Sequence, residues 1–209
     1  MKSKTRVVIF GAGGKVGSLL VEYALAEGYA VTAFIHRHHN LPSHPNLKIT
    51  KGDAYNKIDV QNVLQDADIV LSALSSWGTP KKDVLSAAMT NIIPTMNTCG
   101  IKRIISLTGA EARAAGDTLS VIHRFAHFGI GIVGGKVLHD GEKHIELLEQ
   151  SSLDWTVIRS PIMRSGSSQK YTLNAKRPLP WQLINREAVA RAMIHQLSEK
   201  HSNGAVFIH

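Results

Sequence analysis

Four glycines near the N-terminus are the residues with the clearest chemical use. They stand in the run GAGGKVG at 11–17, directly after the apolar segment Arg6–Phe10 and before apolar residues at helical spacing. Gly11 permits a tight turn, and Gly13 and Gly14 let the backbone approach phosphates with no Cβ in the way. Gly17 lets a helix pack close to the strand. Free N–H groups at the helix N-terminus favour an anion. The run predicts a dinucleotide pyrophosphate site, and the lack of a following Gly-Lys-Ser/Thr excludes a P-loop.

The segment after the second apolar run bears on which dinucleotide binds. NAD enzymes place an acidic residue there for the ribose 2′-hydroxyl, whereas this chain reads FIHRHHN at 34–40. Arg37 offers a guanidinium suited to a 2′-phosphate, and His36, His38 or Lys51 could add positive charge. We expect NADP(H) to be preferred and NAD(H) to be possible. The alternative is that Arg37 is a solvated loop residue.

Histidines are frequent enough to raise the question of a metal. His36, His38, His39 and His44 lie close together, and His123 and His127 could share a helix face. Neutral imidazoles without neighbouring carboxylates or thiolates are commoner as surface residues. No metal site is predicted.

An alternation of strands and helices must position these residues. The predicted strands are Arg6–Phe10, Ala30–Ile35, Leu47–Thr50, Ile69–Ser72, Arg103–Leu107, Trp155–Ile158 and Ala205–Ile208. The predicted helices are Lys15–Glu27, Ile58–Gln65, Lys81–Cys99, Lys136–Gln150 and Arg186–Lys200, the last with Asn185 as its N-cap. Strands separated by helical crossovers imply a parallel sheet covered on both faces. We therefore expect a Rossmann-like, doubly wound α/β fold in a single domain over residues 1–209.

Composition excludes several other classes of protein. The chain has 209 residues, of which 44% are hydrophobic and 19% charged, which describes an ordinary globular domain. Its one cysteine, Cys99, allows neither an internal disulfide nor a thiolate metal cluster. No signal peptide or membrane-length apolar run stands out, so a cytoplasmic location without membrane partners is expected. The net charge of +8 comes from scattered residues, and nucleic acid is not an expected partner.

The sequence resembles the atypical short-chain dehydrogenase/reductase family, in particular its NAD(P)H-binding NmrA-like and biliverdin reductase B-like members. The resemblance spans nearly the whole chain. It rests on GAGGKVG, Arg37, KGDAYN at 51–56, ADIVLSAL at 67–74, KRIISLTGAE at 102–111, LDWTVIRSPIM at 153–163 and REAVARAMIHQL at 186–197.

The resemblance also implies which residues meet the cofactor. The pyrophosphate would be lined by Gly11, Gly13, Gly14, Lys15 and Val16, with Gly17 behind them, and the adenosine end by His36, Arg37, Asp53 and Ala54. Ala73, Leu74 and Ser75 would lie along the cofactor, and Thr108 and Gly109 near the nicotinamide. Asp53 could equally be a turn residue, and Ser75 a local cap.

The catalytic residues are harder to assign. Many members of the superfamily use a Tyr-x-x-x-Lys pair, and no tyrosine of this chain has a lysine four residues later. In HDGEKHIELLEQ, Lys143 resembles the family's lysine and His139 takes the tyrosine's place, where it could donate a proton. His139 could also be inert. Gly109 replaces the family's serine after the fifth strand, which leaves Thr108 as the adjacent hydroxyl.

A small planar or apolar substrate is expected to lie against Phe125, Phe128, Met163, Tyr171 and Trp181, although each could be ordinary core. Gly129, Gly131, Gly134 and Gly135 suggest a loop in this wall.

Three functions follow. The first is an NADP(H)-dependent reductase acting on a flavin, quinone or small carbonyl compound, in which hydride transfer to a flat ring makes little demand on a side-chain acid. The second is a non-catalytic NAD(P)H-sensing regulator of the NmrA-like type, favoured by the missing tyrosine–lysine pair. A nucleotide-sugar epimerase or dehydratase is the third function. It is the least favoured, because such enzymes usually carry a further substrate domain. The sequence assigns no oligomeric state.

Overall fold

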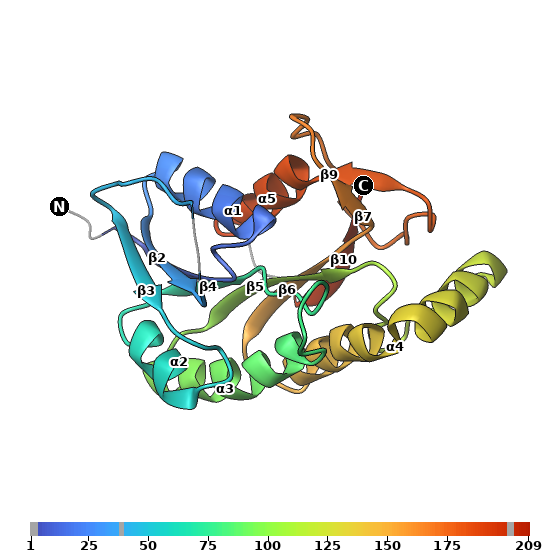
Figure 1. Ribbon diagram of the computed structural model, residues 1–209, viewed down its shortest axis with the longest axis horizontal. Coiled ribbons are helices and arrows are strands. Elements are labelled where there is room, and N and C mark those ends of the chain that lie inside the picture. The colour runs from blue at the N-terminus through green and yellow to red at the C-terminus, as the bar shows by residue number, and fades with distance from the viewer. Residues whose placement is uncertain (1–3, 38–39, 200–202) are drawn as a thin grey trace.

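A mostly parallel eight-stranded sheet in the order β3-β2-β1-β4-β5-β6-β10-β8 organises the chain, as the computed structural model of residues 4–37, 40–199 and 203–209 shows (Figure 1). The strands are β1 (Arg6–Phe10), β2 (Ala30–Ile35), β3 (Leu47–Lys51), β4 (Ile69–Ser72), β5 (Arg103–Gly109), β6 (Asp154–Ser160), β8 (Leu173–Asn174) and β10 (Gly204–Ile208). A separate parallel pair joins β7 (Ile162–Arg164) to β9 (Leu183–Asn185). The strand order reverses between β1 and β4, which is where open α/β sheets bind their ligands.

Helices cover both faces of the sheet. On one face lie α1 (Lys15–Ala26) and α5 (Arg186–His195), and on the other lie α2 (Lys57–Leu64), α3 (Val84–Cys99) and α4 (Val121–Glu149) (Figure 1). Alternate residues of β1 serve the two cores: Val7 and Ile9 pack on the α1 side, and Val8 and Phe10 on the α2–α3 side. Because both faces are covered, the strand is a continuous apolar run.

The expected fold class is confirmed, and each predicted strand and helix is present; apart from the start of α4, their ends match or differ by a few residues. The helix expected at Lys81 begins at Val84, and the helix expected to reach Lys200, which lies outside the described residues, ends at His195. The sequence did not indicate β7, β8 or β9, which are two or three residues long and hold their place through neighbouring strands.

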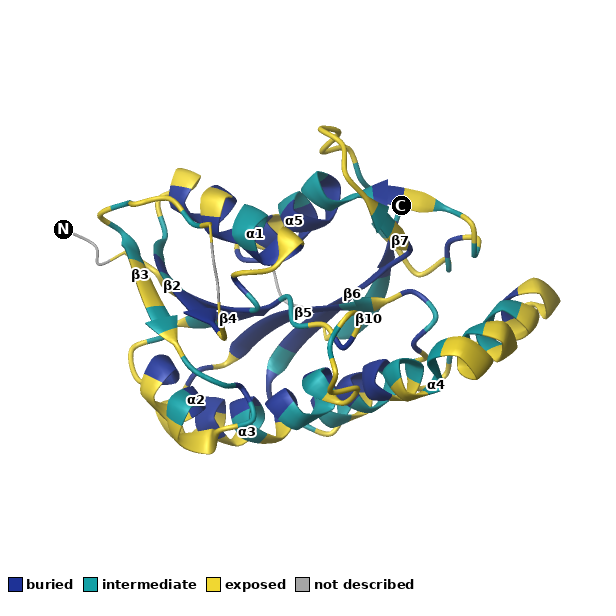
Figure 2. Ribbon diagram, in the orientation of Figure 1, coloured by how far each residue is buried: buried dark blue, intermediate teal, exposed yellow. Residues whose placement is uncertain are grey.

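The largest correction concerns α4. The four glycines at 129–135 suggested a loop, but the helix starts at Val121 and runs through them, with non-helical backbone only at Gly134 (φ −140°, ψ 31°). A glycine inside a helix costs only about 1 kcal/mol relative to alanine, which tertiary contacts can offset. One such contact joins His123 Nε2 to the carbonyl of Pro178 at 3.0 Å. The first half of α4 extends beyond the sheet and is largely exposed (Figure 2).

Among the described residues, no helix combines the length and apolar character required to span a bilayer.

Candidate functional site

The glycine turn joins β1 to α1 and has almost no room for side chains. Gly11 has φ +74°, and a Cβ there would lie 2.7 Å from the carbonyl oxygen of Ala73. A Cβ on Gly17 would lie 2.0 Å from the carbonyl oxygen of Gly11, so only glycine lets α1 begin this close to the turn. Gly13 and Gly14 are exposed, and the first turn of α1 carries no acidic residue. The helix N-terminus is therefore open to an anion.

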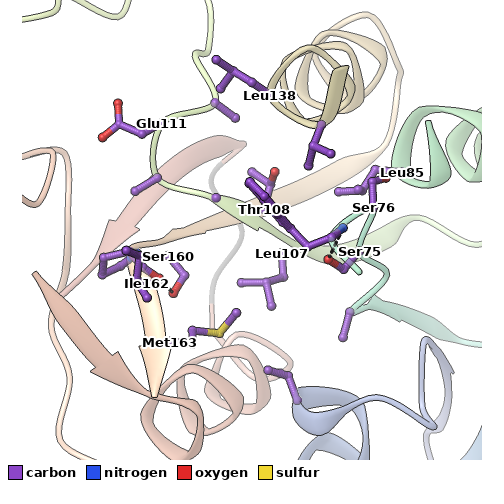
Figure 3. Close-up of a pocket in the computed structure, with 18 of the residues that line it drawn as sticks. Ser75, Ser76, Leu85, Leu107, Thr108, Glu111, Leu138, Ser160, Ile162 and Met163 are labelled. Carbon is purple, nitrogen blue, oxygen red and sulfur yellow. Dashed lines mark hydrogen bonds between the residues drawn. The ribbon is translucent and has the colours of Figure 1, made fainter. Parts of the chain in front are cut away.

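A cavity of about 840 Å³ begins at this turn and continues past the carboxyl ends of the central strands. Figure 3 shows Leu107 and Thr108 of β5 between Ser160, Ile162 and Met163 on one side and Ser75, Ser76 and Leu85 on the other. The apolar part of its wall is made by Leu74, Trp77, Leu85, Leu107, Ile130, Val137, Leu138, Pro161, Ile162, Met163, Pro178, Leu179 and Pro180. One hollow thus links the glycine turn to an apolar chamber.

Eight of the residues expected to meet the cofactor line this cavity. Those that line the cavity are Gly14, Lys15, Val16, Ala73, Leu74, Ser75, Thr108 and Gly109. Ser75 also has a local role, because its hydroxyl accepts a hydrogen bond from the backbone N–H of Trp77 at 3.2 Å. The polar groups that sequence reasoning missed are Ser76, Glu111, Ser160 and Arg186, which also line the cavity. Ser160 is the last residue of the buried strand β6, and this position could have indicated a site residue from the sequence.

The adenosine end of the site lies beyond β2 and β3. His36 and Arg37 are exposed directly after β2, and His38 lies outside the described residues. Asp53 has two roles: Oδ1 accepts from the N–H of Tyr55 at 3.0 Å, and Oδ2 faces His36 Nε2 at 3.9 Å. Lys81 Nζ lies 3.7 Å from the same oxygen. Ala54 is buried beside them. The Asp53 carboxylate therefore lies between His36 and Lys81 at this edge of the site.

His139 and Lys143 do not reach the cavity, and their expected catalytic placement is corrected. His139 is exposed on the outer face of α4, and Lys143 Nζ pairs with Glu146 at 3.1 Å. Each residue along a helix turns by about 100°, so the inward positions are the next ones, Asp140 and His144.

Asp140 holds the residues that form one wall of the cavity. Its carboxylate accepts hydrogen bonds from the N–H groups of Leu85 at 3.0 Å and Ser86 at 2.8 Å, and from the Ser86 hydroxyl at 2.6 Å. The hydroxyl of Ser76 also donates to it. Since the N-cap residue Asp83 makes no side-chain cap bond, Asp140 caps α3 from another helix. This contact fixes the loop that carries Ser75, Ser76 and Trp77.

His144 is fully buried, and its Nε2 lies 2.6 Å from the hydroxyl of Ser106 on β5. Burial lowers the pKa of His144 to about 4, against a smaller opposing effect of the Asp140 charge. The imidazole is therefore neutral near pH 7. His144 is a structural group that holds α4 against the sheet.

Two buried arginines fix the loop that follows β5. Arg159 and Arg177 both donate to the carboxylate of Asp117, Arg177 through Nη2 at 2.7 Å. Arg177 also donates to the carbonyl of Ala110. Their guanidinium carbons lie 3.7 and 4.8 Å from the centre of the Phe207 ring. Burial lowers the pKa of Arg177, which Asp117 and Glu111 oppose. The cavity wall at Ala110 is thereby held in place before any ligand binds.

The expected apolar wall against the substrate is mostly wrong. Of the five proposed residues only Met163 lines the cavity. Phe125 and Phe128 are about 70% exposed on the outer face of α4, at 72% and 69%, and Trp181 is also exposed. The hydroxyl of Tyr171 forms a hydrogen bond with His195 Nδ1 instead. Trp77 is the aromatic residue that does line the cavity, and its ring lies against Gly134, where a Cβ would be 2.9 Å from it.

Comparisons with known proteins agree with this geometry. A family model described as NAD(P)H-binding matches residues 11–200. A short-chain dehydrogenase/reductase from Veillonella parvula in complex with NADP superposes with a TM-score of 0.79 at 16% identity, covering 99% of this chain and 94% of that one. ChuY, an anaerobillin reductase from Escherichia coli O157:H7, gives 0.78 at 21%, covering 98% and 96%. An oxidoreductase from Lactococcus lactis gives 0.81 at 16%, covering 98% and 90%. At these identities the solved structures show a shared fold.

Proposed function

The chain belongs to the NAD(P)H-binding family, and from that premise we propose that it is an NADP(H)-dependent reductase whose acceptor is a flavin, a quinone or a small carbonyl compound.

The observation that carries the proposal is the continuity of the cavity. A hollow of about 840 Å³ extends from Gly14, Lys15 and Val16 to an apolar chamber between β5, β6 and α4. Ligand pockets commonly measure about 300–1,000 Å³, so the hollow has room for the nicotinamide end of a cofactor together with a small acceptor. Its largely apolar wall suits a flat ring system better than a highly charged substrate.

The glycine turn fits a dinucleotide by a test independent of the family match. The Cβ that Gly17 lacks would lie 2.0 Å from a backbone oxygen, and the exposed Gly13 and Gly14 put no side chain between a phosphate and the backbone of the turn. Gly11 to Val16 would hold the pyrophosphate, and Lys15 would add positive charge. When bound, the reduced nicotinamide supplies a hydride.

Selectivity for NADP(H) rests on the adenosine edge. Arg37 is exposed after β2, where an NAD enzyme places its acid, and a guanidinium can bind a 2′-phosphate with two parallel hydrogen bonds. Asp53, the nearby acid, faces His36 and Lys81. The NADP held by the Veillonella parvula relative supports this assignment.

The chain's own hydroxyls can position the reacting rings. Thr108 lines the middle of the cavity, and Ser160 lines it from β6, where its Oγ donates to the Pro161 carbonyl at 2.9 Å. The Thr108 hydroxyl can accept or donate a hydrogen bond at a ligand carbonyl or amide, and the Ser160 oxygen can accept one. A flavin or quinone takes its proton readily from water, so the absence of a tyrosine from the cavity lining is compatible with reduction. The reductase activity named for ChuY supports the same class of reaction.

A fluorescence titration with NADPH and NADH tests the cofactor assignment. Wild type should bind NADPH more tightly than NADH, and Arg37→Ala should weaken NADPH by about tenfold to a hundredfold while changing NADH little, since a hydrogen bond to a charged group contributes about 1.5–3 kcal/mol. Lys102→Ala removes an exposed cation at the opposite ends of the strands and is the control that should change neither. Equal losses for both cofactors in Arg37→Ala would contradict the selectivity.

Turnover separates the reductase from a dinucleotide sensor. NADPH consumption with menadione or FMN would support the reductase. Tight binding without oxidation of NADPH by any acceptor of a broad panel would favour the sensor, and no binding of either dinucleotide would overturn the proposal.

A further inference from the structure

The outer face of the first half of α4 is apolar where a surface helix is normally polar. Four large side chains follow one another along it: Val121, Phe125, Phe128 and Ile132 are 70%, 72%, 69% and 71% exposed. We refer to these four residues as the outer stripe. Ile122 and Val133 flank it at 41% and 86% exposure. This part of the helix extends past the edge of the sheet (Figures 1 and 2). A contiguous exposed apolar surface of this kind marks an interaction site.

The opposite face of the same segment already has its contacts. His123 is buried and its Nε2 lies 3.0 Å from the carbonyl of Pro178, and Ile130 lines the cavity. Amphipathic helices bury their apolar face and expose the polar one. Here the outer stripe points away from the contacts that hold the helix to the protein, so the fold itself leaves it uncovered.

The spacing of the outer stripe is that of a helix–helix seam. Its residues occur at i, i+4, i+7 and i+11, the spacing at which side chains of one helix fit between those of another. Residues 118–139 contain no acidic side chain, and their lysines and arginines are Arg124 and Lys136 alone. Peripheral membrane helices need a cluster of basic residues beside the apolar face, so a lipid surface fits this segment poorly.

The exposed area is close to what one partner of a standard-size specific interface buries. With about 200 Å² for a phenylalanine and about 150 Å² for a valine or isoleucine, the outer stripe and its two flanking residues expose on the order of 700 Å² in each chain. Specific interfaces bury about 800 Å² per partner. A second copy of the chain presents the same apolar stripe, and pairing across a two-fold axis makes such a surface self-complementary.

We propose that this protein forms a two-fold dimer through the outer stripe, with the two α4 helices antiparallel. In the register that pairs the four positions, Phe125 faces Phe128 of the partner subunit and Val121 faces Ile132 of the partner subunit. The same register sets Arg124 opposite Gly129 of the partner subunit, where the missing side chain leaves space for the guanidinium. Because Ile130 is on the same helix segment, dimerisation also braces one wall of the cavity.

Sedimentation over a concentration series tests the proposal. Wild type should sediment as a dimer, and Phe125→Glu/Phe128→Glu should raise the dissociation constant at least about a hundredfold, since truncation at a buried aromatic anchor already costs a factor of about thirty or more. Ile58→Glu is the matched control, because Ile58 is 64% exposed on α2, away from the stripe, and it should leave the dimer intact. Circular dichroism must show unchanged helix content in both variants. A monomeric wild type, or a dimer that survives the double substitution, would overturn the proposal.

Disulfide trapping tests the register. In a Cys99→Ser background, an oxidised mixture of the Phe125→Cys and Phe128→Cys proteins should give more covalent dimer than either protein alone. Equal yields in all three samples would contradict the antiparallel pairing. Co-sedimentation of a monomeric wild type with anionic phospholipid vesicles, lost in the double glutamate variant, would assign the stripe to a membrane surface and overturn self-association.

Discussion

Replacing Gly141 by alanine should disturb the contact between α4 and the cavity wall. A Cβ at 141 would lie 2.7 Å from Thr108 Oγ1 and 3.0 Å from the Cβ of Ala112, and both neighbours line the cavity. The Thr108 hydroxyl can rotate away, but the Ala112 Cβ is fixed to the backbone, so the helix must shift as well.

The expected size follows from two opposing effects. Alanine in place of a helical glycine stabilises by about 1 kcal/mol, and overpacking costs about 1–3 kcal/mol. One contact falls at the limit of what real Cβ atoms show and the other below it, and we expect a net loss of up to about 2 kcal/mol. Gly135→Ala is the matched control on the same helix, because nothing lies within 4 Å of its added Cβ, and it should gain up to about 1 kcal/mol.

Urea denaturation followed by circular dichroism measures the difference between the two variants. The midpoint should fall for Gly141→Ala and rise for Gly135→Ala at an unchanged slope. If Gly141→Ala is as stable as Gly135→Ala, the close packing of α4 on Thr108 is not as described.

Three further predictions concern the supports of the site and its wall. Asp140→Ala removes the acceptor for the N–H groups of Leu85 and Ser86 and should lower the unfolding free energy by about 2–4 kcal/mol; a loss below about 1 kcal/mol in urea denaturation would count against the cap. His144, with its pKa lowered to about 4 in the folded state from about 6.5 unfolded, contributes stability that is present above pH 6.5 and lost as the pH falls towards 4, on the order of 3 kcal/mol in total. His144→Asn should flatten that acid dependence, and an unchanged slope of urea midpoint against pH would refute it. Trp77→Ala should raise the KM for a planar acceptor several-fold with little change in kcat, and an unchanged KM would exclude the indole from the acceptor site.

The glycine turn could be predicted from the sequence because its strand, its glycines and its helix follow one another directly in the chain. A side chain at Gly17 would clash with the backbone of Gly11, six residues earlier. A side chain at Gly11 would clash with the carbonyl of Ala73, which follows the neighbouring strand β4. The apolar run of β1 likewise indicates that both faces of the sheet are covered.

His139 and Lys143 match the family's Tyr-x-x-x-Lys spacing, but this spacing does not indicate which face of the helix points inward. The buried positions of α4 near its end include Gly141, Ile145 and Leu148, which follow a helical repeat. That repeat is visible in the sequence, and it would have directed attention to Asp140 and His144.

The remaining errors depend on contacts between distant segments. His123 is held by Pro178, 55 residues away, and Gly134 lies against the ring of Trp77 in the loop after β4. Neither contact has a local signal, so the first half of α4 could not be oriented from sequence. Phe125 and Phe128 were consequently placed in the cavity although they lie on the outer face.

The proposed reductase transfers hydride, within this cavity, from a bound dinucleotide to a flat acceptor. The most direct measurement is a single turnover, in which protein saturated with NADPH is mixed rapidly with menadione or FMN and the bound nicotinamide is followed optically. We expect the bound NADPH to be oxidised at a rate that exceeds the protein-free reaction and saturates with acceptor. NADPH that binds at the glycine turn but remains reduced, with these acceptors and across a wider panel of quinones, flavins and small carbonyl compounds, would contradict it.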